Sequence, residues 1–214
     1  MIHADAMKLV TAILLAAAIL VPQSAQADHP PSQIVVEFGA AQPKGDLAAD
    51  FYDTRLGLGA ASGLELGFRW RYRFNDNFSL SPSFHFINYK DLRSTDPVVG
   101  DFRIPTSSFR YCLELMWVFG AADSGLRPFI AAAGGVYRNR VEGFYKTFEQ
   151  AFDESVNTLG GSLRAGVQIA AFEVSVVYSV NRFATWRFFD TGFEEDYDWD
   201  NAGVRVGWII PFGE

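Results

Sequence analysis

Residues 64–74 alternate strictly between large apolar side chains and side chains that are charged or small. The apolar positions are Leu64, Leu66, Phe68, Trp70, Tyr72 and Phe74. The positions between them carry Glu65, Gly67, Arg69, Arg71 and Arg73. Alternation with a period of two predicts a β-strand. A strand with one apolar face and one charged face is typical of a sheet that separates lipid from a polar lumen.

The same alternation recurs along the chain. It returns in residues 109–119 and 202–212, and uncharged apolar sets also occur in residues 78–86, 159–169 and 172–180. A Lys or Arg at the bilayer midplane costs about 2 to 4 kcal/mol. An uncharged face that is repeated on strand after strand therefore indicates contact with lipid.

We predict eight strands, each long enough to cross a bilayer at a tilt. They are residues 33–41, 63–74, 78–89, 106–119, 126–141, 157–170, 172–183 and 199–212. Long connections at 42–62, 90–105, 142–156 and 184–198 alternate with short ones at 75–77, 120–125 and 170–171. This pattern predicts an all-β fold, an eight-stranded antiparallel up-and-down transmembrane β-barrel with its short turns in the periplasm. The facing of the fifth strand stays open because both of its alternating sets are apolar or small.

Parity constrains the first short turn. If Arg73 and Ser79 both face inward, the hairpin needs an odd number of loop residues, most simply Asn75-Asp76-Asn77 with one Asn in the left-handed conformation. The same register places Gly67 beside His85.

The N-terminal segment predicts export. Residues 9–21 form an unbroken apolar run that follows Lys8 and precedes the small-residue sequence Ser24-Ala25-Gln26-Ala27. We predict a signal peptide at residues 1–27, cleaved after Ala27, and a barrel domain at residues 28–214. A buried N-terminal helix is the alternative.

Composition excludes two classes of protein. Cys112 is the only cysteine in the 214 residues, so the chain is not a small disulfide-stapled secreted fold. The formal net charge of −7 argues against a nucleic-acid partner, which requires clustered surface Lys and Arg.

The polar faces of the predicted strands meet in the lumen. Eight strands leave room for packed side chains and not for a wide pore, and buried charges must be paired. We therefore predict a lumenal network of ion pairs and hydrogen bonds, with a narrow ion path as the alternative. Its members are Glu37, Glu65, Arg69, Arg71, Arg73, His85, Arg110, Glu114, Arg164, Glu173 and Arg205.

Catalysis would have to depend on His85, because the only other histidine after the signal peptide is His29, near the new N-terminus. His85 shares its inward face with Ser83, and Glu114 lies on the neighbouring strand, which supplies the residue types of a hydrolase triad. Side chains two residues apart on a strand are about 6 to 7 Å apart, too far for a Ser-His hydrogen bond. We predict no catalytic residue, with a lipid hydrolase centred on His85 as the alternative.

We predict no cofactor and no metal site, because the chain has no phosphate-binding glycine loop and no metal-ligand spacing of Cys and His. Residues 190–200 are rich in Asp and Glu but do not have the spacing of a calcium loop. A solvated surface loop is the expected structure there, and divalent-ion bridging to lipopolysaccharide is the alternative.

Together, these features resemble the small outer-membrane β-barrel superfamily that includes the OmpA transmembrane domain, OmpX and the opacity-type proteins. The resemblance covers residues 33–212 and includes the closing sequence Trp208-Ile209-Ile210-Pro211-Phe212, although two further residues follow the terminal aromatic. Lipid A deacylase barrels share this architecture, but their His-x-Ser-Asn motif is absent. The nearest sequence is His85-Phe86-Ile87-Asn88.

The resemblance implies an integral protein of the Gram-negative outer membrane that acts through its loops or as a structural element, without catalysis. The partners it implies are outer-membrane lipids, lipopolysaccharide and an extracellular molecule bound by the surface loops. A soluble calycin-like barrel that binds an apolar ligand is a further alternative.

Overall fold

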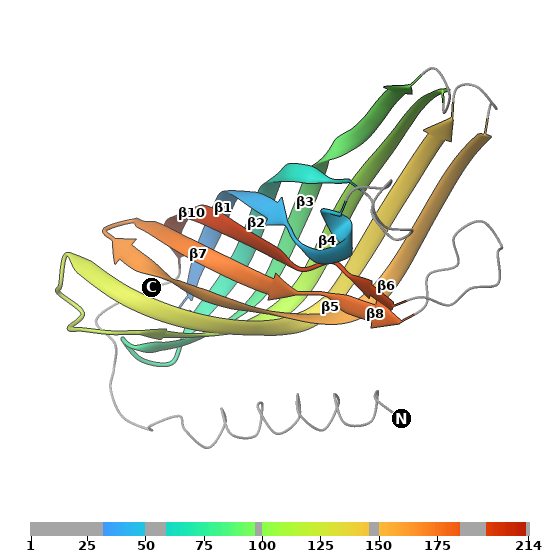
Figure 1. Ribbon diagram of the computed structural model, residues 1–214. Helices are drawn as coiled ribbons and strands as arrows, with labels where there is room; N and C mark the ends of the chain where they lie inside the picture. The colour runs from blue at the N-terminus through green and yellow to red at the C-terminus, as the bar shows by residue number, and fades with distance from the viewer. Residues whose placement is uncertain (1–31, 50–58, 97–99, 146–149, 185–195, 213–214) are drawn as a thin grey trace.

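Eight long strands wind into a closed antiparallel barrel in the computed structural model, which describes residues 32–49, 59–96, 100–145, 150–184 and 196–212 (Figure 1). The barrel strands are β1 (Ser32–Pro43), β2 (Ala61–Arg73), β3 (Phe78–Asp96), β4 (Gly100–Val118), β5 (Leu126–Tyr145), β6 (Gln150–Ile169), β7 (Phe172–Val180) and β10 (Asn201–Phe212). A 3-10 helix, η1 (Gly45–Leu47), and a small sheet of β8 (Arg182–Ala184) and β9 (Asp196–Asp198) complete the described chain. Among these residues, no helix is both long and apolar enough to span a bilayer.

The barrel closes through its first and last strands. β1 pairs with β2 on one side and with β10 on the other, where Ser32 lies opposite Phe212 and Pro43 lies opposite Asn201. Closure gives every strand two neighbours within the membrane and leaves no unpaired edge in hydrocarbon. The predicted eight-stranded up-and-down barrel is confirmed.

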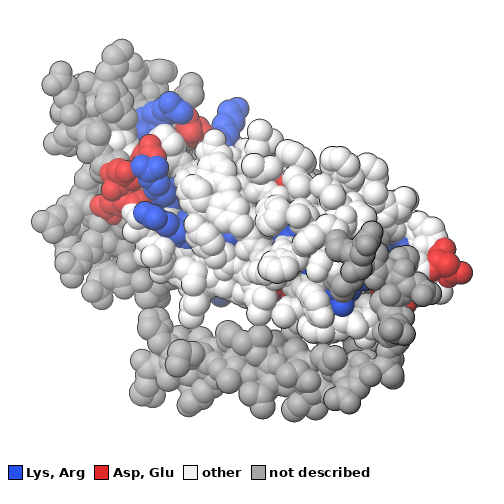
Figure 2. Space-filling view, turned by 180° about the vertical axis from the view of Figure 1, so that it is seen from behind, with Lys and Arg blue, Asp and Glu red and all other residues white. Residues whose placement is uncertain are grey.

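Apolar side chains cover the outside of the barrel. Leu64, Leu163 and Val176 are 77%, 67% and 59% exposed, which is the reverse of a water-soluble protein. Figure 2 shows a broad band almost without charge, with Lys, Arg, Asp and Glu gathered toward the ends of the barrel. The outward sets expected from the alternation face lipid, so the calycin-like alternative, with its apolar residues inside, is wrong.

The fifth strand has a defined facing in the structure. Phe129 and Tyr137 of β5 are buried inside the barrel, whereas Ile130 and Val136 are 53% and 42% exposed on its surface. The odd-numbered set therefore points into the lumen and contributes two large rings to it.

The first short turn has the predicted register but not the predicted backbone. Arg73 lies opposite Ser79, and Gly67 lies opposite His85. The Asn75 side-chain oxygen accepts hydrogen bonds from the backbone N–H groups of Asn77 (2.9 Å) and Phe78 (2.8 Å). No residue of the turn has a positive φ, so the expected left-handed Asn is wrong, and this side-chain hydrogen bonding shapes the turn instead.

Two of the expected long loops are continued strands. The β3–β4 hairpin extends to Asp96 and Gly100, and the β5–β6 hairpin extends to Tyr145 and Gln150, where residues 90–105 and 142–156 were expected to be loops. The two hairpins also pair with each other, because Phe102 of β4 lies opposite Tyr145 of β5. They form a four-stranded sheet that projects beyond the other strands (Figure 1, green and gold). We call this extension the projecting sheet.

Candidate functional site

Charged side chains from five strands converge in the middle of the barrel. Inward positions of β1, β2, β4, β6 and β7 supply Glu37, Arg69, Glu114, Arg164 and Glu173, all at most 4% exposed. Each faces inward because it belongs to the polar set of an alternating strand. They come together because the small barrel brings the inner faces of its strands within reach of long side chains.

Arg69 lies at the centre of this cluster. Its Nε and Nη2 atoms donate to the two carboxylate oxygens of Glu37 at 3.0 and 2.9 Å, and its Nη1 donates to Glu114 at 2.6 Å. Nη2 also bonds Glu173. Arg164 contacts the same three carboxylates, with Glu114 at 2.7 Å and Glu37 at 3.1 Å. The two guanidinium groups therefore hold three carboxylates together.

Arg71 balances the charge of the central cluster. Its Nη2 bonds Glu173, and its Nη1 donates to Gln33 at 3.2 Å. Three arginines, at 69, 71 and 164, thus face three glutamates, at 37, 114 and 173. A matched set of this kind is needed, because an unpaired charge in a desolvated site is strongly destabilising.

A second cluster lies beside the first. Arg205 lies 2.7 Å from Glu65, and the two ring nitrogens of His85 lie 3.2 Å from Glu65 and 3.7 Å from Glu37. Gly67 makes room for this ring, because a Cβ at that position would be 2.5 Å from His85 Nδ1. His85 thus links the two clusters.

Aromatic rings from β5 cover two of the arginines. The guanidinium of Arg164 lies 4.8 Å from the centre of the Phe129 ring, and that of Arg110 lies 4.8 Å from the centre of the Tyr137 ring. Arg110 also donates to Ser179 at 3.0 Å. The alternation could not identify these rings as lumenal, because the facing of their strand was open.

A cluster of amide and hydroxyl side chains also lies in the lumen, and the sequence analysis did not identify it. Asn139 exchanges hydrogen bonds with Asn181 at 2.9 and 3.2 Å, and Thr158 donates to Asn181 at 2.7 Å. Ser108 donates to Asn139 at 2.9 Å. Their positions in the inward-facing sets of their strands could have indicated this cluster. Uncharged polar residues are also common in solvent-exposed loops, so their residue types alone did not place them in the lumen.

The predicted members do not all join one network. Arg73 stands apart from the central clusters and pairs with Asp76 at 3.0 Å, at the short-turn end of the barrel. The other ten predicted residues lie buried in the lumen.

Little space remains beside His85 in the middle of the barrel. The cavity beside His85, Arg110 and Glu114 has a volume of about 10 Å³. A single water needs about that much, so a substrate or a hydrated ion does not fit. The ion pairs and rings close the lumen at this level.

Residues from the long-loop end cover the outer mouth. Leu47 of η1 and Trp199 are fully buried there. The Asp200 side chain accepts hydrogen bonds from Asn181 N–H at 3.0 Å and from the Tyr178 hydroxyl at 2.9 Å, and Asp46 accepts one from the N–H of Asp198 at 2.8 Å. Burial, together with the neighbouring Asp200, raises the pKa of Asp198. Of the acidic segment 190–200, residues 190–195 lie outside the described chain.

The geometry around His85 is not that of a hydrolase. Both ring nitrogens face carboxylates, and the Ser83 hydroxyl donates to the backbone carbonyl of Cys112 at 3.4 Å. Within the described ranges, no group of three or more His, Cys, Asp or Glu side chains is arranged to hold a metal ion.

Comparisons with known proteins agree with this architecture. The family model described as "Outer membrane protein beta-barrel domain" matches residues 11–209, whereas no curated protein sequence matches the chain. Neisserial surface protein A superimposes with a TM-score of 0.50 at 14% identity, covering 85% of this chain and 97% of that one. Ail of Yersinia pestis, solved with the heparin analogue sucrose octasulfate, has a TM-score of 0.50 at 13% identity, covering 85% and 99%.

These structural likenesses concern the fold alone, whereas the family match covers most of the chain. The closed barrel, the lipid-facing exterior and the family match together establish that this chain belongs to the outer membrane protein β-barrel domain family and is an integral protein of the Gram-negative outer membrane.

Proposed function

We propose that this protein is a non-catalytic interaction protein of the outer membrane, in which a sealed barrel anchors a sheet that binds a partner outside the cell. The projecting sheet is the observation that carries this proposal. Long connections of outer-membrane barrels lie on the extracellular side, so this sheet extends away from the cell surface.

The edges of the projecting sheet that have no paired strand among the described residues are its main binding feature. β2 pairs with β3 only as far as Lys90, and β7 pairs with β6 only from Gly161 onward. Within the described chain, β6 therefore continues from Gly160 back to Gln150 with no strand paired along this edge, although β8 lies close to part of it, and this length is on the order of 30 Å at about 3.3 Å per residue. An exposed strand edge offers backbone donors and acceptors to an extended segment of another molecule.

Charged side chains on the projecting sheet limit indiscriminate pairing. Arg140 lies 2.9 Å from Glu142 and 2.5 Å from Asp153, and Arg103 lies 2.5 Å from Asp91. Asp91 lies on the edge strand β3 and Asp153 on the edge strand β6, and charges along an exposed edge oppose aggregation with unrelated strands. A partner must accommodate this pattern, so the charges support selectivity.

The closed lumen supports a role in binding and not in transport or catalysis. The central ion pairs occupy the space that a permeant molecule would need, and the histidine faces carboxylates. The lipid exterior implies outer-membrane lipids and lipopolysaccharide as the other partners. Ail, which shares the fold, is by name an attachment invasion locus protein.

A shortened hairpin tests the proposal. Residues 142–153 are replaced by Asn-Gly, which leaves Val141 opposite Glu154 as the last pair of β5 and β6. In the matched control, residues 121–124 of a short turn at the other end are replaced by Gly-Ser-Gly-Ser. Bacteria expressing each form are tested for adhesion to epithelial monolayers and to immobilised heparin, after surface display has been equalised.

We expect the shortened hairpin to reduce adhesion at least tenfold to one of the two surfaces and the control to leave it unchanged. Binding to heparin alone would identify a sulfated polysaccharide as the partner class. Equal adhesion of the wild type, the shortened form and cells without the gene would overturn the proposal.

A further inference from the structure

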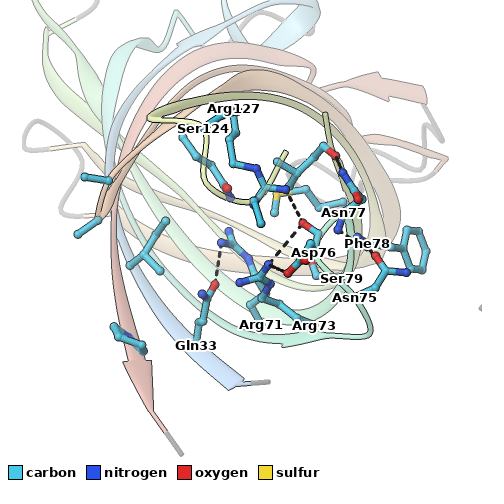
Figure 3. A pocket seen from close by; sticks show the side chains of 18 of the residues that line it. Gln33, Arg71, Arg73, Asn75, Asp76, Asn77, Phe78, Ser79, Ser124 and Arg127 are labelled. Carbon is cyan, nitrogen blue, oxygen red and sulfur yellow. Dashed lines mark hydrogen bonds and ion pairs between the residues drawn. The ribbon is translucent and has the colours of Figure 1, made fainter. Parts of the chain in front are cut away.

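A cavity opens at the opposite end of the lumen, below the central ion pairs. Its volume is about 510 Å³, and Figure 3 shows it between the short turns, with side chains from β1, β2, β3 and β5 pointing into it. We call it the vestibule. Its polar lining includes Gln33, Arg71, Arg73, Asp76, Ser79 and Arg127. It faces the periplasm, because the short turns of outer-membrane barrels lie on that side.

The vestibule has more positive than negative charge. Arg71, Arg73 and Arg127 line it, and Asp76 is the only carboxylate among its described lining residues. The Asp76 side chain binds Arg73 at 3.0 Å, whereas Arg127 donates to the backbone carbonyl of Asp76, at 2.6 Å. Arg71 forms an ion pair with Glu173, which is also paired with Arg69 and Arg164 of the central cluster. Among the described residues, the positive charge of Arg127 therefore has no carboxylate of its own in the vestibule.

Three buried donors in the vestibule have no hydrogen-bond partner among the described residues. They are Nε of Arg71, Nε of Arg127 and the hydroxyl of Ser79, on residues that are 1%, 7% and 3% exposed. Similar donors occur in the sealed middle of the barrel, but the cavity there has a volume of only about 10 Å³. In the vestibule, by contrast, a cavity of about 510 Å³ lies beside these donors and leaves room for an acceptor group.

We propose that the vestibule binds the phosphoryl group of a ligand that enters from the periplasmic side. A phosphoryl group carries several acceptor oxygens and negative charge, and guanidinium groups match its geometry. Gln33 and Ser79 add uncharged donors beside the arginines. The volume also accommodates the atoms that carry the phosphoryl group, since small-molecule pockets range from about 300 to 1,000 Å³.

Two sources share this chemistry. The inner leaflet of the outer membrane presents phospholipid headgroups at the rim of the barrel, and the periplasm holds soluble phosphates. This site is independent of the projecting sheet, which lies at the other end of the molecule, so either proposal stands if the other fails.

The test uses the full mature chain, folded in a non-ionic detergent that contains no phosphate. Pyrophosphate and a short-chain phosphatidic acid are titrated separately by isothermal calorimetry. The variants are Arg127→Gln and Ser79→Ala, and Arg138→Gln is the matched control because it removes the same charge from an exposed position on the outer face of the same strand. Heat-dependent gel mobility shows that each variant is folded.

We expect saturable binding of at least one probe to the wild type, weakened at least about tenfold in Arg127→Gln and unchanged within about twofold in Arg138→Gln. Binding of phosphatidic acid alone identifies a lipid headgroup, and binding of pyrophosphate identifies a soluble phosphate. If Arg127→Gln does not fold, Ser79→Ala must show the loss of affinity. Absence of binding to either probe, or equal loss in the vestibule variants and the control, overturns the proposal.

Discussion

Arginine–carboxylate pairs occur both in the middle of the barrel and on the projecting sheet, but they are buried in the first region and exposed to solvent in the second. Arg69 and Glu114 in the lumen are 0% and 4% exposed, whereas Arg140 and Asp153 on the sheet are 41% and 56% exposed. The hydrogen bond from Arg140 lowers the pKa of Asp153, but water and salt screen this exposed pair. Loss of one partner is therefore costly for a lumenal pair, whereas an exposed pair on the sheet contributes little to stability.

Removal of the central guanidinium should have the largest effect on stability. Arg69→Ser removes one of the two arginines that Glu37, Glu114 and Glu173 share and leaves these carboxylates with an unbalanced buried charge, and we expect a loss of about 3 to 5 kcal/mol in the free energy of unfolding. Urea unfolding in lipid vesicles, followed by gel mobility, measures it. A loss as small as that of an exposed pair would show that water enters the middle of the barrel.

A charge on the lipid face should have the next largest effect. Val176→Arg places a cation on the 59% exposed outer face of β7, and we expect a cost of about 2 to 4 kcal/mol for insertion. Folding yield into vesicles gives the readout, with Val176→Leu as control. Equal yields for the two variants would contradict the assigned lipid face.

Removal of an exposed pair should leave stability unchanged. In Arg140→Ala, the side chains of Glu142 and Asp153 remain solvated, so we expect the same unfolding midpoint as in the wild type. The same urea titration measures it at low and high salt. A clear loss of stability would mean that the projecting sheet contributes to folding of the barrel.

The chemistry of the outer membrane should not depend on the lumenal histidine. His85→Ala removes a ring that lies between two carboxylates. Because this ring does not act as a base for a serine hydroxyl, lipid A should keep its acyl chains in cells that express either form. Mass spectrometry of lipid A compares wild type, His85→Ala and cells without the gene. A change in acylation that only the wild type produces would establish the hydrolase.

The alternation of residues in the sequence predicted the strands and their faces wherever lipid lies on one side. Val176 and Arg205 could be placed from parity alone, because hydrocarbon excludes charge. The projecting sheet could not be predicted in this way, since both of its faces meet water and neither must be apolar. The outward extension of β3 and β6 was consequently mistaken for loops.

The partners of each lumenal charge also lay beyond sequence analysis. Arg69 contacts Glu37 and Glu173, which lie 32 and 104 residues away along the chain, and only strand order and register bring them together. Both alternating sets of β5 are small or apolar, so the inward facing of Phe129 and Tyr137 emerged only from the fold. The vestibule forms where three short turns come together, and a pattern of neighbouring residues in the sequence does not predict how distant turns are arranged.

The pairing of β1 with β10 has a consequence for assembly of the barrel. Glu37 near the start of the chain binds Arg164, which lies 127 residues later, and the last strand must arrive before the seam can be sealed. Until β10 pairs with β1, the sheet has two unpaired edges and its inward arginines are not yet enclosed in a lumen. Because an unpaired strand edge is unfavourable in hydrocarbon, the pairing of β10 with β1 is the step that makes the sheet compatible with the membrane.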